Sequence, residues 1–121
     1  MNALTPEAIV QAQLDAYNAK DIERLLSIYA DDAQHFDQVS GALLAQGSAQ
    51  LRERFALRFA DPLLHAALLN RICAGEIVID HERIRRTFPE GPGSMELVAC
   101  YQVQAGRIPR AWFVFGAITL D

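Results

Sequence analysis

The hydrophobic period of the sequence changes near its midpoint, and this change limits the folds open to the chain. Before residue 62 the apolar residues mostly recur at helical spacing, whereas from His65 onward they form strand-like runs. These runs are separated by the turn sequences "AGE", "PEGPG" and "AGR". Long runs joined by short turns predict a meander of antiparallel strands. The chain is therefore expected to belong to the α+β class, with helices covering one face of a curved sheet.

The first half predicts three helices and one strand. Residues 5–7, "TPE", have the residue types of a helix N-cap and first turn, and Asp21 is a second candidate N-cap. Ser48 is the expected cap of a third helix, which ends before Pro62. The segment "QHFD", residues 34–37, is expected to be a strand between the second and third helices.

Length and composition predict one domain over residues 1–121, because a chain of this size builds a single hydrophobic core. Eleven basic residues are outnumbered by fifteen acidic ones, which argues against a nucleic-acid partner. No apolar window is long enough for a membrane span, so a soluble, cytoplasmic protein is expected. Cys73 and Cys100 lie in separate strand-like runs and are expected to be small buried thiols.

A strongly curved sheet with helices across it encloses a cone. Such a cone can leave a pocket with one closed end, and pockets of this shape are common binding sites for small ligands. We therefore expect a small hydrophobic ligand inside the cone.

Three segments together carry a resemblance to known proteins: "AYNAKDIERLLSIYADDAQHFD", "GSAQLRERF" and "GRIPRAWFVFG". In their order and spacing the chain resembles, over nearly its whole length, the nuclear transport factor 2-like superfamily, and within it the SnoaL-like and ketosteroid isomerase-like proteins. It implies a cystatin-like curved antiparallel sheet wrapped around helices. It also implies a homodimer and, for the enzymes among these proteins, acid-base chemistry without a cofactor.

The resemblance to ketosteroid isomerase implies Asp37 as the general base. The two oxyanion donors of that family fall at Gln13 and Ala99, which are not the expected tyrosine and protonated acid. Because one such donor contributes about 3–4 kcal/mol to the stability of a transition state, steroid isomerisation by that mechanism is not expected.

Strand alternation places His35 on the same face as Asp37. The family phase places His81 on the cavity face of its strand, and Glu82 on the opposite face. We therefore predict Asp37 as a catalytic base with His35 and His81 as partners. The structural alternatives are a turn carboxylate for Asp37, a hydrogen bond at the cavity rim for His35, and a solvated position for His81. The same three side chains offer a metal site only as a minor alternative, because the sequence lacks short metal-ligand spacing.

Aromatic residues at core positions are also expected to contact the ligand. The predicted ligand-binding residues are Gln13, Tyr17, Phe55, Phe59, Ala99, Tyr101 and Phe113. Trp112 alternates with Phe113 and is expected outside the cone, beside Val114. Such an apolar patch predicts a homodimer interface on the outer sheet face.

Two functions fit these observations. The first is an acid-base enzyme without a cofactor, of the isomerase, cyclase, dehydratase or hydrolase type, with Asp37 as base. The second is a non-catalytic module for ligand binding or dimerisation, which the residues at Gln13 and Ala99 favour.

Overall fold

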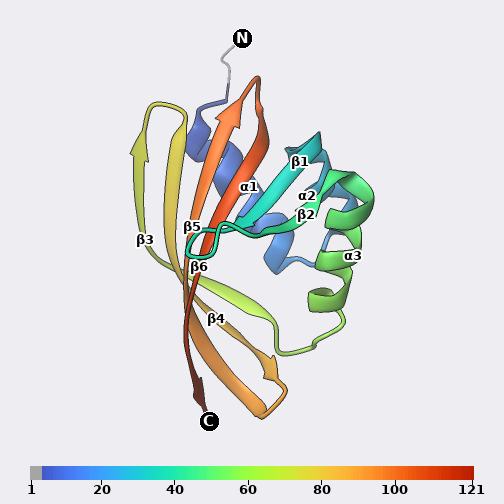
Figure 1. Ribbon diagram of the computed structural model, residues 1–121, viewed down its shortest axis with the longest axis vertical. Coiled ribbons are helices and arrows are strands. Elements are labelled where there is room, and N and C mark those ends of the chain that lie inside the picture. The colour runs from blue at the N-terminus through green and yellow to red at the C-terminus, as the bar shows by residue number, and fades with distance from the viewer. Residues whose placement is uncertain (1–3) are drawn as a thin grey trace.

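The computed structural model describes residues 4–121 and has the expected α+β architecture (Figure 1). The elements follow in the order α1 (Pro6–Asn18), α2 (Ile22–Ile28), β1 (Tyr29–Asp37), β2 (Leu43–Gln46), α3 (Gly47–Phe59), β3 (His65–Ala74), β4 (Ile77–Phe88), β5 (Gly91–Gln104) and β6 (Arg107–Leu120).

One six-stranded sheet has the order β2-β1-β6-β5-β4-β3. The meander from β3 to β6 is antiparallel, as expected from its short turns. The meander brings β6 back beside β1, and these two strands are parallel, so the sheet is mixed. The short edge strand β2 has four residues and was not expected.

The predicted N-caps of the first two helices are confirmed. Thr5 Oγ1 accepts a hydrogen bond from Ala8 N at 3.1 Å, and Asp21 Oδ1 accepts one from Arg24 N at 3.2 Å. The third prediction is wrong, because Ser48 lies inside α3. There the chain turns at Gly47, whose φ of 82° suits glycine, and the helix begins two residues earlier than predicted, with Gln46 at the N-cap position.

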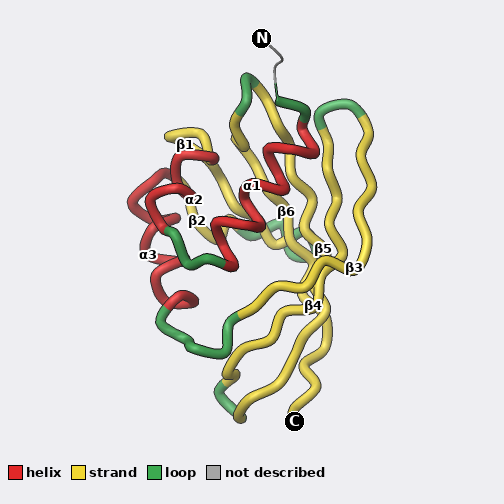
Figure 2. The backbone as a smooth tube through the Cα atoms, turned by 180° about the vertical axis from the view of Figure 1, so that it is seen from behind, coloured by secondary structure: helices red, strands yellow, loops and turns green. Residues whose placement is uncertain are grey.

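The helices cover the concave face of the sheet. Figure 2 shows α1 crossing in front of the strands, with α2 and α3 beside it. Asn18, at the end of α1, bonds both backbone groups of Ala66 in β3, at 2.9 and 2.8 Å. These bonds hold α1 at a fixed position over the sheet. The core between the helices and the sheet contains the fully buried side chains of Leu25 from α2, Leu51 from α3 and Tyr29 from β1.

A bulge bends the sheet where β5 meets β6. The pairing register shifts between Met95 and Leu97, opposite Gly116. A Cβ atom at Gly116 would lie 2.7 Å from Glu96 O, so the close approach of the two strands requires glycine.

Both cysteines are free, and Cys100 is partly buried. The expectation of a buried thiol is wrong for Cys73, which is exposed because it lies near the end of the edge strand β3. Within residues 4–121, no helix is long and apolar enough to cross a membrane.

Candidate functional site

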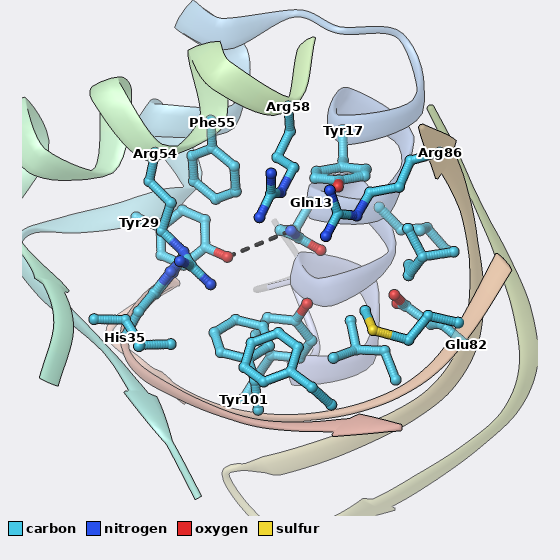
Figure 3. A pocket seen from close by; sticks show the side chains of 17 residues that line it. Gln13, Tyr17, Tyr29, His35, Arg54, Phe55, Arg58, Glu82, Arg86 and Tyr101 are labelled. Carbon is cyan, nitrogen blue, oxygen red and sulfur yellow. Dashed lines mark hydrogen bonds between the residues drawn. The ribbon is translucent and has the colours of Figure 1, made fainter. Parts of the chain in front are cut away.

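A cavity of about 330 Å³ lies between the concave face of the sheet and helices α1 and α3 (Figure 3). Most of its surface is apolar, as is usual for sites that bind small molecules. The apolar lining residues are Leu14, Leu44, Phe55, Ile84, Met95, Leu97, Phe113 and Phe115.

Among residues 4–121, Glu82 is the only one whose carboxyl group lines this cavity. It points inward from β4 and is almost fully buried, and its Oε2 atom has no hydrogen-bond partner within the described chain. Burial raises the pKa of Glu82 to about 7, and the nearby charge of Asp80 adds to this effect. Glu82 can therefore both release and accept a proton near neutral pH.

Asp80 lies two residues before Glu82 on the same face, but it has a cation beside it. Arg71 Nε and Nη2 bond the two carboxylate oxygens of Asp80 at 2.6 and 3.0 Å, and Arg71 Nη1 bonds Gln11 Oε1 at 2.8 Å. This bidentate pair places a guanidinium group directly against the buried Asp80 carboxylate. The pair ties β3, β4 and α1 together and does not line the cavity.

His35 lines the cavity from β1 and is fully buried, as its predicted phase requires. The rings of Tyr29, Phe55 and Phe113 surround it, with centroids 5.2, 5.6 and 4.9 Å away. Burial lowers the pKa of His35 to about 3, and the positive charge of Arg54 adds to the effect. The imidazole is therefore neutral, and neither ring nitrogen has a hydrogen-bond partner among residues 4–121.

Tyrosine hydroxyl groups supply hydrogen-bond donors to the cavity. Gln13 Nε2 donates to Tyr29 Oη at 3.3 Å, which leaves the hydroxyl hydrogen of Tyr29 available to a ligand. The hydroxyl of Tyr101 points into the cavity (Figure 3). Burial raises the pKa of Tyr29 and of Tyr101 well above the usual value, so both stay protonated. Two such donors suit an oxygen atom that gains negative charge.

Three arginines also line the cavity, Arg54 and Arg58 from α3 and Arg86 from β4. Arg58 is exposed, yet its side chain also lines the cavity, which places it at the cavity mouth. Burial lowers the pKa of Arg54 and of Arg86, and the positive charge of Arg58 lowers both further. The mouth therefore carries concentrated positive charge.

The expected convergence of Asp37, His35 and His81 is not found, because only His35 lines the cavity. Asp37 ends β1 and its Oδ1 atom accepts hydrogen bonds from Val39 N and Ser40 N, at 2.9 and 3.1 Å. The Asp37 carboxylate is therefore hydrogen-bonded to the backbone of the turn that follows the strand. The catalytic role of Asp37 stays a prediction.

The expected phase of β4 is wrong. Glu82 pairs in register with Leu97 and both face the helices, so His81 lies on the outer face. The His81 side chain is 40% exposed, and its Nε2 atom is 3.5 Å from Glu96 Oε2. The alternation of a strand fixes this result, because one inward residue determines the direction of all its neighbours.

Five predicted ligand-binding residues line the cavity: Gln13, Tyr17, Phe55, Tyr101 and Phe113. Phe59 packs behind the wall, with its ring centroid 5.5 Å from that of Tyr17. Ala99 is buried within the sheet, where its short side chain does not reach the cavity. Sequence reasoning missed Tyr29, Arg54, Glu82 and Arg86 as lining residues.

The part of the chain that the structure describes contains no group of three His, Cys, Asp or Glu side chains placed to hold a metal ion. The polar groups of the cavity are suited to hydrogen bonding, proton transfer and anion binding.

Comparison with known proteins relates this fold to solved structures. An uncharacterised cystatin-fold protein from Novosphingobium aromaticivorans has a TM-score of 0.83 and 24% identity, over 93% of this chain and 99% of that one. A hypothetical protein from Catenulispora acidiphila with a ketosteroid isomerase-like fold, solved with trimethylamine, has a TM-score of 0.76 and 20% identity, over 93% and 88%. These similarities show the shared fold.

A third structure, of a proposed polyketide cyclase from Sinorhizobium meliloti, has a TM-score of 0.72 and 23% identity, over 91% of this chain and 99% of that one. Among curated proteins, none matches the sequence. The family described as "SnoaL-like domain" matches residues 10–111, which is most of the chain. Because this family model matches most of the chain and the fold agrees with it, the chain belongs to the SnoaL-like domain family.

Proposed function

We propose that this protein binds a small, mainly apolar molecule in the cone and catalyses proton transfer on it, with Glu82 as the acid-base group. One observation carries the proposal: a buried carboxyl group, which has no cation partner among residues 4–121 and whose pKa burial raises to about 7, faces a mainly apolar cavity. A general base works best when its pKa lies near the working pH. Perturbed titratable groups in a cavity are typical of catalytic sites.

The neighbouring groups support a reaction beside a carbonyl. The ionised form of Glu82 would take a proton from the carbon next to the carbonyl, and the electron pair of that C–H bond would move toward the carbonyl oxygen. The hydroxyl groups of Tyr29 and Tyr101 would donate hydrogen bonds to that oxygen as its negative charge grows. They would take the place of the family donors that are missing at Gln13 and Ala99.

An isomerase or cyclase fits this proton transfer. Both reactions can begin by removing a proton beside a carbonyl, and the similar structure from Sinorhizobium meliloti is a proposed polyketide cyclase. Asp37 remains the alternative base, by its resemblance to ketosteroid isomerase. Its engagement in the turn after β1 makes Glu82 the stronger candidate.

Deuterium exchange tests this function without knowledge of the substrate. A panel of small cyclic ketones and β-diketones is incubated in D2O, and loss of the α-proton signal is followed by NMR. Wild-type protein is expected to accelerate exchange in at least one ketone, and Glu82→Gln to lose about 10²–10⁴-fold of that acceleration. Glu96→Gln is the matched control, because Glu96 is exposed and pairs with His81 on the outer face. Equal exchange by wild type and Glu82→Gln would remove Glu82 as the base.

A non-catalytic binding module is the second candidate function. The unpartnered polar atoms of Gln13 and His35 favour it, because they offer hydrogen bonds to a ligand without any proton transfer. This function predicts that a neutral dye such as N-phenyl-1-naphthylamine binds wild type and Glu82→Gln equally, while no ketone of the panel exchanges faster.

We also propose a homodimer through the outer sheet face. Phe36 and Trp112 stack on this face with centroids 6.0 Å apart, and Val114 lies next along β6 on the same side. Trp112→Glu is expected to convert a dimer into a monomer by light scattering. Leu57→Glu, at an exposed position on α3, is the control and should leave the mass unchanged.

A further inference from the structure

We propose that the arginines at the cavity mouth bind the anionic end of the ligand. The ligand is then an amphiphile, with an apolar body inside the cone and a carboxylate or phosphate group at Arg54, Arg58 and Arg86. This inference deepens the proposed function, since it concerns the ligand of the same cavity. It requires binding there, but it does not require that Glu82 transfers a proton.

The first argument is a contrast between arginines inside and outside the cavity. Five outside arginines have a carboxylate oxygen within 4.0 Å: Arg52, Arg71, Arg83, Arg85 and Arg107. None of the three cavity arginines has one among residues 4–121. Arg24 and Arg110 also lack one, but both are exposed and line no cavity. The chain has fifteen acidic residues, so unpaired guanidinium groups that share one cavity require an explanation.

The second argument is the crowding of like charge. Arg54 and Arg58 lie four residues apart on α3, where like charges destabilise a helix. Arg86 reaches the same cavity from β4, and the charge of Arg58 disfavours the charged forms of both Arg54 and Arg86. Figure 3 shows the guanidinium groups of Arg58 and Arg86 on the side of the cavity nearest Tyr17. A bound anion would relieve this repulsion.

The nearest acidic groups do not supply that anion. Asp61 attracts Arg86, but its carboxylate already accepts hydrogen bonds from Leu63 N and from the Thr87 backbone and hydroxyl. Glu82 has a pKa of about 7 and is therefore uncharged in about half of the molecules at neutral pH. No carboxylate among residues 4–121 pairs with the three guanidinium groups, and the rings of Phe88 and Phe113, over which Arg86 and Arg54 lie, carry no net negative charge.

The third argument is the combination of this mouth with the cavity walls. Guanidinium groups bind carboxylate and phosphate through paired hydrogen bonds. Leu14, Leu97 and Phe113 line the same cavity, and an apolar group that replaces water against them gains binding free energy. The volume of about 330 Å³ is at the lower end for small-molecule sites. A short organic acid or alkyl phosphate fits both features, whereas inorganic phosphate leaves the walls uncovered.

Displacement of N-phenyl-1-naphthylamine measures this preference with defined probes. The dye is neutral and reports occupation of the cavity, and the competitors are octanoate, octyl phosphate, 1-octanol and inorganic phosphate. For wild type, we expect octanoate or octyl phosphate to compete about tenfold more tightly than octanol, and inorganic phosphate to displace no dye. The anion that displaces the dye at the lower concentration shows whether the mouth prefers a carboxylate or a phosphate group.

Charge-removing variants assign the preference to the mouth. Arg58→Gln and Arg86→Gln should each weaken the preferred anion about fivefold to tenfold and leave octanol unchanged. Arg58→Lys should retain more of the preference than Arg58→Gln. Arg52→Gln is the matched control, since Arg52 lies on the same helix but pairs with Glu23 outside the cavity. Urea midpoints for every variant show whether each is folded.

Equal affinity for octanol and both anions in wild type would overturn the inference and leave the proposed function standing. An equal effect of Arg58→Gln on octanol and on the anion would also overturn it. If neither the dye nor any octyl compound binds to folded protein, the inference and the proposed function both fail.

Discussion

Asp80 and Glu82 point to the same side of β4, and Arg71 holds Asp80 through two hydrogen bonds while Glu82 Oε2 has no partner in residues 4–121. The difference follows from position. Asp80 lies opposite Arg71 of β3, whereas Glu82 pairs with Leu97 on the other side and faces the cavity. The two carboxyl groups therefore differ in their surroundings: Asp80 is paired with a cation, and Glu82 faces the cavity with a pKa raised by burial to about 7.

Replacement of Glu82 by glutamine should change how stability depends on pH. The pKa of Glu82 is about 7 in the folded protein and 4.5 as the reference value, so its contribution is fully present below pH 4.5 and is lost as the pH rises to 7. Relative to wild type, Glu82→Gln should gain about 1.4 kcal/mol of unfolding free energy per pH unit between pH 5 and 6.5. Urea unfolding at several pH values measures this slope. A difference that stays constant with pH would contradict the assigned pKa.

His35 should produce the opposite slope. The pKa of His35 is about 3 in the folded protein and 6.5 as the reference value. Between these two pH values the imidazole is therefore protonated in the unfolded chain and neutral in the folded protein. Wild type should lose about 1.4 kcal/mol per pH unit, relative to His35→Leu, as the pH falls from 6 to 4. Between pH 5 and 6 the contributions of His35 and Glu82 should cancel in wild type. Urea unfolding of the two single variants checks this compensation, because Glu82→Gln should keep the slope of His35 and His35→Leu the opposite slope of Glu82.

Removal of Arg71 should destabilise the fold because Asp80 would be left buried without its cation. Arg71→Met is expected to cost about 3–5 kcal/mol of unfolding free energy at pH 7. The double change Arg71→Met with Asp80→Leu should recover part of this loss, since it removes the uncompensated charge. Arg52→Met breaks an exposed pair with Glu23 and should have no measurable effect. A similarly small effect of Arg71→Met in urea unfolding would mean that the pair is not buried in solution.

Asp37→Asn separates the two candidate bases. The amide oxygen of asparagine can still accept the hydrogen bonds from Val39 N and Ser40 N, so the urea midpoint should stay close to that of wild type. If Glu82 is the base, α-proton exchange should also be retained in the NMR assay. Loss of exchange in a folded Asp37→Asn protein, with Glu82→Gln still active, would make Asp37 the base.

Part of the fold could be predicted from local sequence signals. Thr5 and Asp21 act as N-caps because each can bond a backbone N–H without help from distant residues. The period change at His65 separates the helices from the β-meander, since turn residues bound each strand. Phe113 lines the cavity and Trp112 lies on the other face, as alternation along β6 predicts.

The candidate site could not be predicted from local sequence signals, because strand pairing and contacts between distant residues determine it. Polar residues occupy both faces of β4, so alternation cannot tell whether His81 or Glu82 faces the helices, and pairing with the buried Leu97 decides it. Asp37 has the predicted strand position, but the strand ends there and the next turn takes its carboxylate. Arg58 is exposed on its helix, yet its side chain lines the cavity, and helical periodicity does not reveal this position.

The pKa of Glu82 is the most direct test of the proposed function. The 13C signal of its side-chain carboxyl group, assigned by its absence in Glu82→Gln, is followed by NMR from pH 4 to 9, with and without 1-octanol in the cavity. We predict a midpoint near 7 for the free protein and a higher midpoint with octanol bound, because the ligand removes water from the carboxyl group. A midpoint near 4.5 that octanol does not change would show that Glu82 is solvated and outside the ligand site.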